Sequence, residues 1–513
     1  MPIRRLRLSL RVACALIAPA VIGAVLADAP IKPGATASDA YDTNRWWSPG
    51  DGKPFPAAAS YGNENGTVTT LNASGPTDTR GHPFFTAIGT NGRACVTCHQ
   101  PADGMSISVA TIRARWQDTQ GKDPLFAAID GANCPDLPPQ QASSHSLLLD
   151  RGLFRIFRPW PPKAADGSAI EAQFTIEVVR DPTGCNNSKT YGLHSANPMI
   201  SVYRRPRPPT NLKYVTSIGF AFEPKNGLPL PIDPATGRQT SFNMMADARN
   251  RTLPTQATEA MLTHLQVAAA PTKAQIQRII DFETQLYTAQ SHDKWGGALT
   301  AAGAQGGPEM LQRSLEGDLQ YSGNPIWSEF LPWKKLPADA GDAAQRQFRE
   351  SVARGAQIFA TRTFLIWDAA GITSMQFGNP VRNSCAFCHN MARTGMDVAP
   401  GQVDLGTTNE PFAKPAPELP LFKLTCKPEH RPHPHLGRVV YTQDPGFALT
   451  TGRCIDIGKI TIQQMRGLSA RAPYFSNGSA QTLREIVDFY DQRYNIGYSE
   501  QEKQDLTNLM SVL

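Results

Sequence analysis

Beyond its first 27 residues the sequence has no apolar run long enough to cross a membrane and no cluster of basic residues. No later segment reaches the roughly 18 consecutive apolar residues that a spanning helix needs. Lysine and arginine are scattered, and the formal net charge of the 513 residues is +6, which does not suit a chain that follows nucleic-acid phosphates. We therefore expect no membrane span after signal removal and no nucleic-acid partner. Cysteine and histidine are also scarce, at nine and ten residues, so their spacing is informative.

The N-terminus has the features of an export signal. Four arginines within the first eleven residues precede a mostly apolar stretch over residues 12–26, and small residues offer a cleavage site. The apolar stretch is too short and too rich in small residues for a convincing transmembrane helix. We predict a signal peptide over residues 1–27 and a periplasmic location, with an uncleaved anchor as the alternative.

Two short motifs use four of the nine cysteines. Residues Cys95, Cys98 and His99, and again Cys385, Cys388 and His389, follow the pattern Cys-x-x-Cys-His, the attachment signature of c-type haem. The two thiols add across the vinyl groups of one porphyrin, and the histidine ligates the iron as its proximal base. A lone Cys-x-x-Cys also fits a thioredoxin-like redox pair or half a zinc site, but neither explains a trailing histidine twice. We predict two covalently attached c-type haems with iron.

The remaining cysteines support export. One cysteine lies in the predicted signal, and Cys134, Cys185, Cys426 and Cys454 are left. An even number in an oxidising compartment favours two disulfides. Order along the chain pairs the first two and the last two, and four buried free thiols are the alternative.

Apolar periodicity predicts helices and a few short strands. Spacings of three and four residues favour helices, and alternation favours strands. Thr272 suits the N-cap of one such helix. The expected helices cover residues 106–116, 255–267, 272–288, 344–359, 480–494 and 499–513. The expected strands cover residues 146–158, 172–180, 419–425 and 437–442.

One C-terminal stretch carries a family likeness. Residues 466–479, read as RGLSARAPYFSNGS, with Thr482-Leu483 and residues 487–490 after them, resemble the bacterial dihaem cytochrome c peroxidase superfamily. That superfamily includes the enzyme that matures methylamine dehydrogenase, and rubber oxygenases are more distant relatives. The resemblance implies a mainly α fold of two cytochrome c-like haem domains with irregular insertions and a few short strands. The expected division is a lead-in over 28–80, haem domains over 81–290 and 344–513, and a loop-rich connection over 291–343.

The resemblance also implies axial ligands and an inter-haem arrangement. The C-terminal haem of the family passes electrons, and its second axial ligand corresponds to Tyr490, where a core tyrosine is the alternative. Met465 or a histidine from residues 430–435 are further candidates for that ligand. The asparagine that helps hold an inter-haem calcium corresponds to Arg204, whose guanidinium could instead bind haem propionates. Calcium is therefore doubtful.

The N-terminal haem of the family is where peroxide or oxygen reacts. His194 lies near the place of a displaceable distal histidine, although an ordinary loop histidine also fits. The segment around Gln256 resembles the family's distal glutamine segment, but the family's catalytic glutamate is replaced by Gln266. His264 is then the candidate acid/base, because a neutral imidazole can move protons at neutral pH.

These inferences predict an exported dihaem oxidoreductase that reduces hydrogen peroxide. Its partners would be a small electron-donor protein, either a cytochrome or a cupredoxin, and peroxide or oxygen. Two alternatives stay open. One is a pure electron-transfer cytochrome with both irons six-coordinate, and the other is a haem oxygenase-type enzyme acting on an organic substrate.

Overall fold

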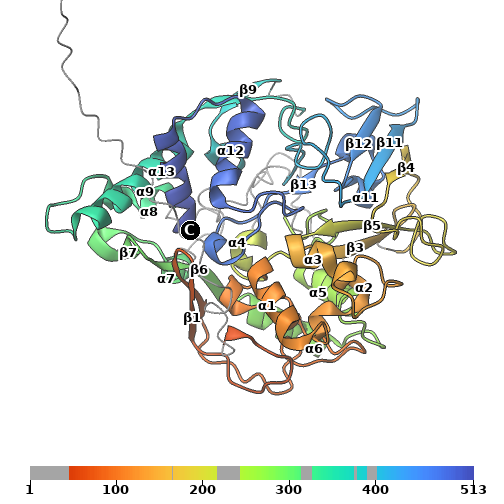
Figure 1. The fold of residues 1–513 in the computed structure, drawn as a ribbon, viewed down its shortest axis with the longest axis horizontal. Coiled ribbons are helices and arrows are strands. Elements are labelled where there is room, and N and C mark those ends of the chain that lie inside the picture. Colours follow the sequence, from red (N-terminus) through yellow and green to blue (C-terminus); the bar gives the residue numbers. More distant parts are fainter. Residues whose placement is uncertain (1–44, 165, 217–242, 314–325, 375–377, 390–400) are drawn as a thin grey trace, which may run out of the picture. The chain divides into compact units, whose positions relative to one another are not determined.

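A computed structural model describes residues 45–164, 166–216, 243–313, 326–374, 378–389 and 401–513 (Figure 1). The predicted signal peptide over 1–27 lies outside these residues. The helices are α1 (Val109–Thr119), α2 (Ala128–Gly131), α3 (Ser146–Arg151), α4 (Leu212–Thr216), α5 (Leu253–Thr263), α6 (Lys273–Glu283), α7 (Pro308–Arg313), α8 (Ile326–Glu329), α9 (Ala343–Thr361), α10 (Cys385–Cys388), α11 (Ala448–Thr451), α12 (Leu483–Tyr494) and α13 (Glu500–Ser511). The strands are β1 (Ala58–Asn63), β2 (Gly66–Asn72), β3 (Phe154–Pro159), β4 (Phe174–Arg180), β5 (Met199–Arg204), β6 (Leu286–Asp293), β7 (Gly297–Ala298), β8 (Phe364–Ile366), β9 (Val381–Asn383), β10 (Gln402–Val403), β11 (Leu421–Cys426), β12 (Val439–Thr442) and β13 (Ile460–Thr461).

Helices form at all six expected places, and local capping explains where several begin. Thr272 caps α6, and its side chain and Gln275 form a reciprocal capping box. Ser499 and Glu502 do the same for α13. The helix expected over 272–288 nevertheless ends early, because the chain from Leu286 onward pairs with β2 as a strand.

The strand expected over residues 146–158 is only half correct. Its first half is helix α3, and its second half is strand β3. Gly152 separates them at a φ of 62° and donates its amide to the carbonyls of Leu147 and Leu148. A glycine in this left-handed conformation ends a helix without the steric cost that a Cβ would bring. The other three expected strands form as β4, β11 and β12.

Five small sheets occur within the described ranges. The largest has the order β1-β2-β6-β7. Strands β1 and β2 form a hairpin within the expected lead-in, and β2 pairs with β6, which lies more than 200 residues later in the chain. A second has the order β12-β11-β4, and Figure 1 shows yellow β4 beside blue β11. This sheet joins the two expected haem domains. Helices and sheets are both substantial, so the mainly α class is not clearly met, and the proposed domain boundaries stay predictions.

Both expected disulfides form. Cys134 bonds to Cys185, and Cys426 bonds to Cys454. The second bridge links the end of β11 to the turn after α11. Across the described ranges we find no helix with the length and apolar character of a membrane span.

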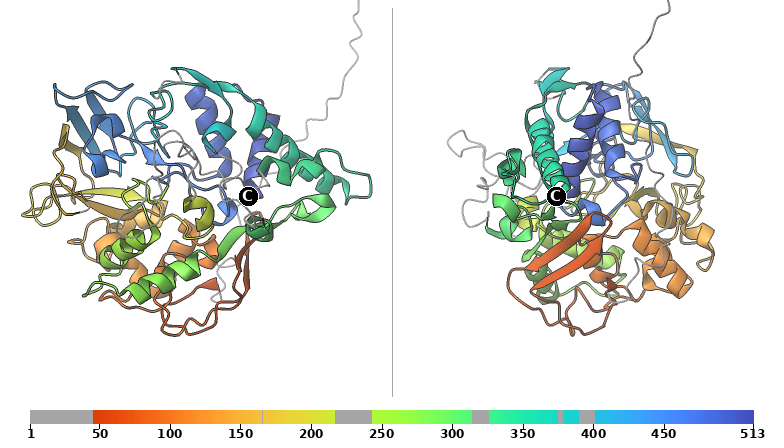
Figure 2. Two further views of the ribbon diagram at one scale, coloured as in Figure 1. Left: turned by 180° about the vertical axis from the view of Figure 1, so that it is seen from behind. Right: turned by 60° about the vertical axis from the view of Figure 1, so that its left-hand side comes forward.

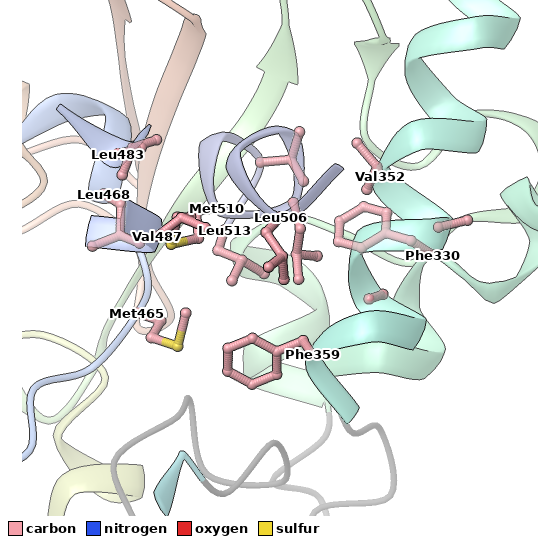
Figure 3. Packing of buried hydrophobic residues seen from close by; sticks show 14 of the residues in the cluster. Phe330, Val352, Phe359, Met465, Leu468, Leu483, Val487, Leu506, Met510 and Leu513 are labelled. Carbon is pink, nitrogen blue, oxygen red and sulfur yellow. The ribbon is translucent and has the colours of Figure 1, made fainter. Parts of the chain in front are cut away.

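The C-terminal core packs α13 against both α9 and α12. Figure 2 shows teal α9 beside the blue C-terminal helices in both views. Val352 and Phe359 of α9 meet Leu506 and Met510 of α13 in this core, and Met465 lies close by (Figure 3). Phe359, Met465, Leu506 and Met510 also line the cavity of the second Cys-x-x-Cys-His motif. The packing of this core therefore shapes one wall of that site.

Candidate functional site: two cavities with one shared wall

The first Cys-x-x-Cys-His motif lies on a tight 3-10 turn over Cys95–Thr97. The His99 amide donates to the Cys95 carbonyl over 3.1 Å, which closes the turn. Cys95, Cys98 and His99 all line one cavity of about 200 Å³. Neither sulfur is part of a disulfide, and burial raises the pKa of Cys98 to about 12. The cavity therefore presents two neutral thiols and an imidazole to whatever it binds.

The protonation of His99 suits an iron ligand. Nδ1 lies 3.2 Å from the Met105 carbonyl oxygen, and a carbonyl only accepts, so Nδ1 carries the proton. Nε2 then keeps its lone pair. Burial lowers the pKa of His99 to about 4, so the ring is neutral at physiological pH. A neutral imidazole whose other nitrogen is held by a carbonyl is the usual form of a metal-ligating histidine.

The second motif repeats this arrangement on α10. The His389 amide donates to the Cys385 carbonyl over 2.9 Å. Cys385, Cys388 and His389 line a second cavity of about 190 Å³. Burial raises the pKa of Cys385 to about 11 and that of Cys388 to about 12. Both thiols are free, and Tyr498 has its hydroxyl 4.0 Å from the Cys385 sulfur.

The two cavities share part of their lining. Arg205, Pro206, Gln463 and Gln464 line both of them. Arg205 and Pro206 follow β5 directly, and the Arg205 amide donates to the Ser476 carbonyl over 2.8 Å. Strand β5 pairs antiparallel with β3, so this sheet determines the position of Arg205 and Pro206 in the lining of both cavities.

The second cavity brings together two of the candidate axial ligands. Tyr490 and Met465 both line it, whereas the described lining contains no histidine from residues 430–435. Burial is the main reason that the pKa of Tyr490 is raised well above its ordinary value, followed by Tyr494 and the two motif sulfurs. Tyr490 and Tyr494 stack with ring centroids 6.3 Å apart. Ligation by Tyr490 stays a prediction.

The first cavity contains two of the three expected side chains. Gln256 and His264 line it, while His194 is exposed and is not among its lining residues. His264 Nδ1 lies 2.5 Å from Asp130 Oδ2. Asp130 also binds Arg93; burial would raise the pKa of this carboxyl, but Arg93 and His264 together lower it. A carboxylate that holds the Nδ1–H of a histidine leaves Nε2 as a base, as in catalytic dyads.

Sequence reasoning missed an acidic side chain in the same cavity. Glu283, at the end of α6, lines the first cavity and is 6% exposed. Burial raises its pKa to about 8, and no hydrogen bond or ion pair to another described residue offsets this. The signal was present, because Glu283 follows Ile276, Ile279 and Ile280 at spacings of three and four, on the apolar stripe of its helix.

Arg204 was expected to bind haem propionates, but it binds carboxylates of the chain instead. Its Nε and Nη2 donate to the two oxygens of Asp444 over 2.6 and 2.8 Å, and its Nη1 donates to Asp247 over 2.7 Å. This fork is already occupied by carboxylates, so Arg204 has little left to offer a propionate. Within the described part of the chain no group of three or more His, Cys, Asp or Glu residues is arranged to hold a metal ion.

The donor set of each cavity fits a c-type haem. Two neighbouring free thiols and an imidazole that line one cavity are what thioether attachment and proximal ligation require. The two cavities have nearly equal volumes, and in each motif the histidine amide donates to the carbonyl of the first cysteine. These similarities suit two cavities that bind the same kind of ligand.

Comparison with known proteins adds little. The sequence matches no protein-family model, and it matches no curated protein. A solved structure of a MauG-like protein associated with microbial copper homeostasis shares 17% sequence identity, over 55% of this chain and 76% of that chain. Its TM-score is 0.26, which is too low to carry an argument about fold or function.

Proposed function

We propose that this chain is an exported, periplasmic oxidoreductase that carries two covalently attached c-type haems and reduces hydrogen peroxide. One observation carries the proposal. Each Cys-x-x-Cys-His motif presents free thiols and a histidine to its own cavity, and the two cavities are alike in volume and meet at one wall. A thioredoxin-like pair or a zinc site would need neither the paired cavities nor the second histidine.

The neutral thiols suit attachment. Each S–H adds across a vinyl C=C, so that the sulfur bonds to carbon and the proton goes to the neighbouring carbon. When bound, the two irons supply one-electron transfer, and an iron with an open axial position supplies peroxide chemistry. Arg205, Pro206, Gln463 and Gln464 line both cavities, so electrons passing between the two haems would cross this shared wall.

The first cavity is the better candidate for peroxide reduction. It contains His264 with Nδ1 held by Asp130, and it contains the buried acid Glu283. His264 Nε2 can accept a proton from peroxide, and a protonated Glu283 can donate one. The second cavity contains Tyr490 and Met465 instead. Either side chain could ligate the iron of a haem bound there, which would suit a site that only passes electrons.

Counting covalent haem tests the foundation of the proposal. The full chain should keep two haems per molecule after boiling in detergent, measured by haem stain and pyridine haemochrome. The pair Cys95→Ser and Cys98→Ser should keep one. As a control, the pair Cys426→Ser and Cys454→Ser also replaces two cysteines, those of a disulfide, but should keep both haems. Loss of the stain from the unaltered protein would overturn the proposal.

Stopped-flow mixing of the reduced holoprotein with hydrogen peroxide tests the activity. We expect oxidation of haem much faster than that of free haem. A holoprotein with two haems that peroxide oxidises no faster than free haem would favour the pure electron carrier. Oxygen uptake that depends on an added hydrocarbon would favour the oxygenase.

A further inference from the structure

Three buried arginines in the cavity walls have no carboxylate partner among the described residues. Arg205 donates through Nη1 to the Gly152 carbonyl over 3.1 Å and through Nη2 to the carbonyls of Ile107 and Arg471 over 2.5 and 3.0 Å. Carbonyl oxygens orient a guanidinium, but they do not neutralise its charge. Arg205 lines both cavities.

Arg207 and Arg471 have the same kind of surroundings, one at each cavity. Arg207 lines the first cavity and donates to the carbonyls of Asn243, over 3.3 Å, and Thr461. Its Nε is buried without a hydrogen-bond partner in the described part of the chain. Arg471 lines the second cavity and donates through Nη2 to the Gln464 carbonyl over 2.5 Å and through Nε to a second carbonyl over 3.3 Å.

Several other buried arginines bind carboxylates of the chain. Arg204 forks onto Asp444, and Arg466 forks onto Glu329 with distances of 2.6 and 3.0 Å. The chain can therefore neutralise a buried cation with its own carboxylates, although Arg155 and Arg349, away from both cavities, also donate only to neutral oxygens among the described residues. Three other arginines of the first cavity lining, Arg93, Arg204 and Arg249, each bind an aspartate. Arg205, Arg207 and Arg471 line the cavities without an acidic partner among the described residues, and we take this to mark where a ligand brings the negative charge.

Burying the charges of these three arginines costs free energy. An ion removed from water without a counter-charge loses several kcal/mol. Burial, and then the charge of Arg471, lowers the pKa of Arg205 to about 9. Burial, and then the charge of Arg204, does the same to Arg207. Burial lowers the pKa of Arg471 to about 10. An anion bound in the cavities that these three arginines line would offset the cost of burying their charges.

We propose that Arg205, Arg207 and Arg471 bind the propionate groups of the two haems. Arg207 serves the first haem, Arg471 serves the second, and Arg205 contacts a propionate of each. The inference rests on the proposed dihaem function. Unlike Arg204, these three arginines have no carboxylate beside them, and each keeps N–H groups that its carbonyl partners do not use and that can donate to a propionate. Arg205 then couples the two haems electrostatically, because one positive charge stabilises the ferrous form at both.

Redox titration of the holoprotein tests this assignment, with the two haems distinguished by their electron paramagnetic resonance signals. Removing a nearby positive charge favours ferric iron and lowers the midpoint potential. We expect Arg205→Gln to lower both potentials, Arg207→Gln to lower only that of the first haem, and Arg471→Gln to lower only that of the second. Each shift should be about tenfold in the ferric-to-ferrous equilibrium, or about 59 mV for one electron.

A matched control separates charge removal at the cavities from charge removal in general. Arg346 is half-buried, lines neither cavity and, like Arg205, donates to carbonyls, those of Ala338 and Gly341. Arg346→Gln should leave both potentials unchanged. If Arg205→Gln does not fold, the single-cavity variants still decide, because each must shift one haem alone.

The outcomes separate the two proposals. A wild-type protein without covalent haem would refute the dihaem function itself. A protein with two haems, whose potentials stay fixed in all three variants or move together in the single-cavity variants, would overturn the propionate assignment alone.

Discussion

Glu283→Gln should stabilise the protein above pH 5, which is unusual for a change to a buried side chain. Glu283 lines the first cavity without a hydrogen-bond partner among the described residues, and burial raises its pKa to about 8 from an ordinary value of 4.5. The folded protein therefore holds this proton at pH values where the unfolded chain releases it. Between these two pKa values, stability falls as pH rises.

The size of the effect follows from this gap. An interval of about 3.5 pH units at about 1.36 kcal/mol per unit gives a penalty of about 5 kcal/mol once the pH exceeds 8. Glutamine has nearly the same shape but does not ionise, so Glu283→Gln removes the penalty. The difference in unfolding free energy between variant and parent should grow by about 1.4 kcal/mol per pH unit from pH 5 to 8 and then level off.

Urea unfolding of the holoprotein at a series of pH values, from 5 to 9, measures this difference. Glu329→Gln is the control, because Glu329 is also buried but binds Arg466 through both of its oxygens. That change leaves a buried cation unpaired and should destabilise the protein. A Glu283→Gln variant whose stability relative to the parent does not change with pH would refute the reasoning about Glu283.

Three further predictions concern other parts of the molecule. Tyr490→Phe should change the low-spin ferric spectrum of the second haem, whereas Tyr494→Phe, one helical turn away, should not; an unchanged Tyr490→Phe spectrum excludes the ligand. His264→Gln should slow oxidation of the reduced protein by peroxide by a factor of about 100 or more, the usual contribution of an acid/base group, while the haem content stays at two. Replacing Cys426 and Cys454 by alanine should lower the unfolding free energy by about 3.5 kcal/mol, from the closed loop of 28 residues, as measured in urea.

Local sequence patterns were sufficient for the parts of the site that depend on neighbours in the chain. A Cys-x-x-Cys-His motif needs only one turn, and the structure places Cys95 and His99 on such a turn. Helix starts such as Thr272 depend on the next three residues, and they were predicted too. Order along the chain was also enough to pair the four remaining cysteines.

Contacts between distant segments could not be read in the same way. Asp130 meets His264 across 134 positions, and nothing near either residue in the sequence indicates the other. Arg204 and Arg205 are identical neighbours, but one binds Asp444 and Asp247 and the other binds carbonyls. The different partners of these two arginines follow from the packing around the end of β5, which local sequence does not reveal. Glu283 could have been identified from the sequence, because a carboxyl on the apolar face of a helix is unusual and marks a candidate functional residue.

The sheet that joins β4 to β11 has a consequence for how the chain is made. β4 receives its partner strand from residues 421–426, so it waits as an unpaired edge until most of the polypeptide has emerged. A shortened protein that stops before Leu421 would expose that edge and should aggregate. The N-terminal half with β4 and the C-terminal half with β11 therefore depend on each other for folding, and we expect neither half to be soluble when it is produced alone.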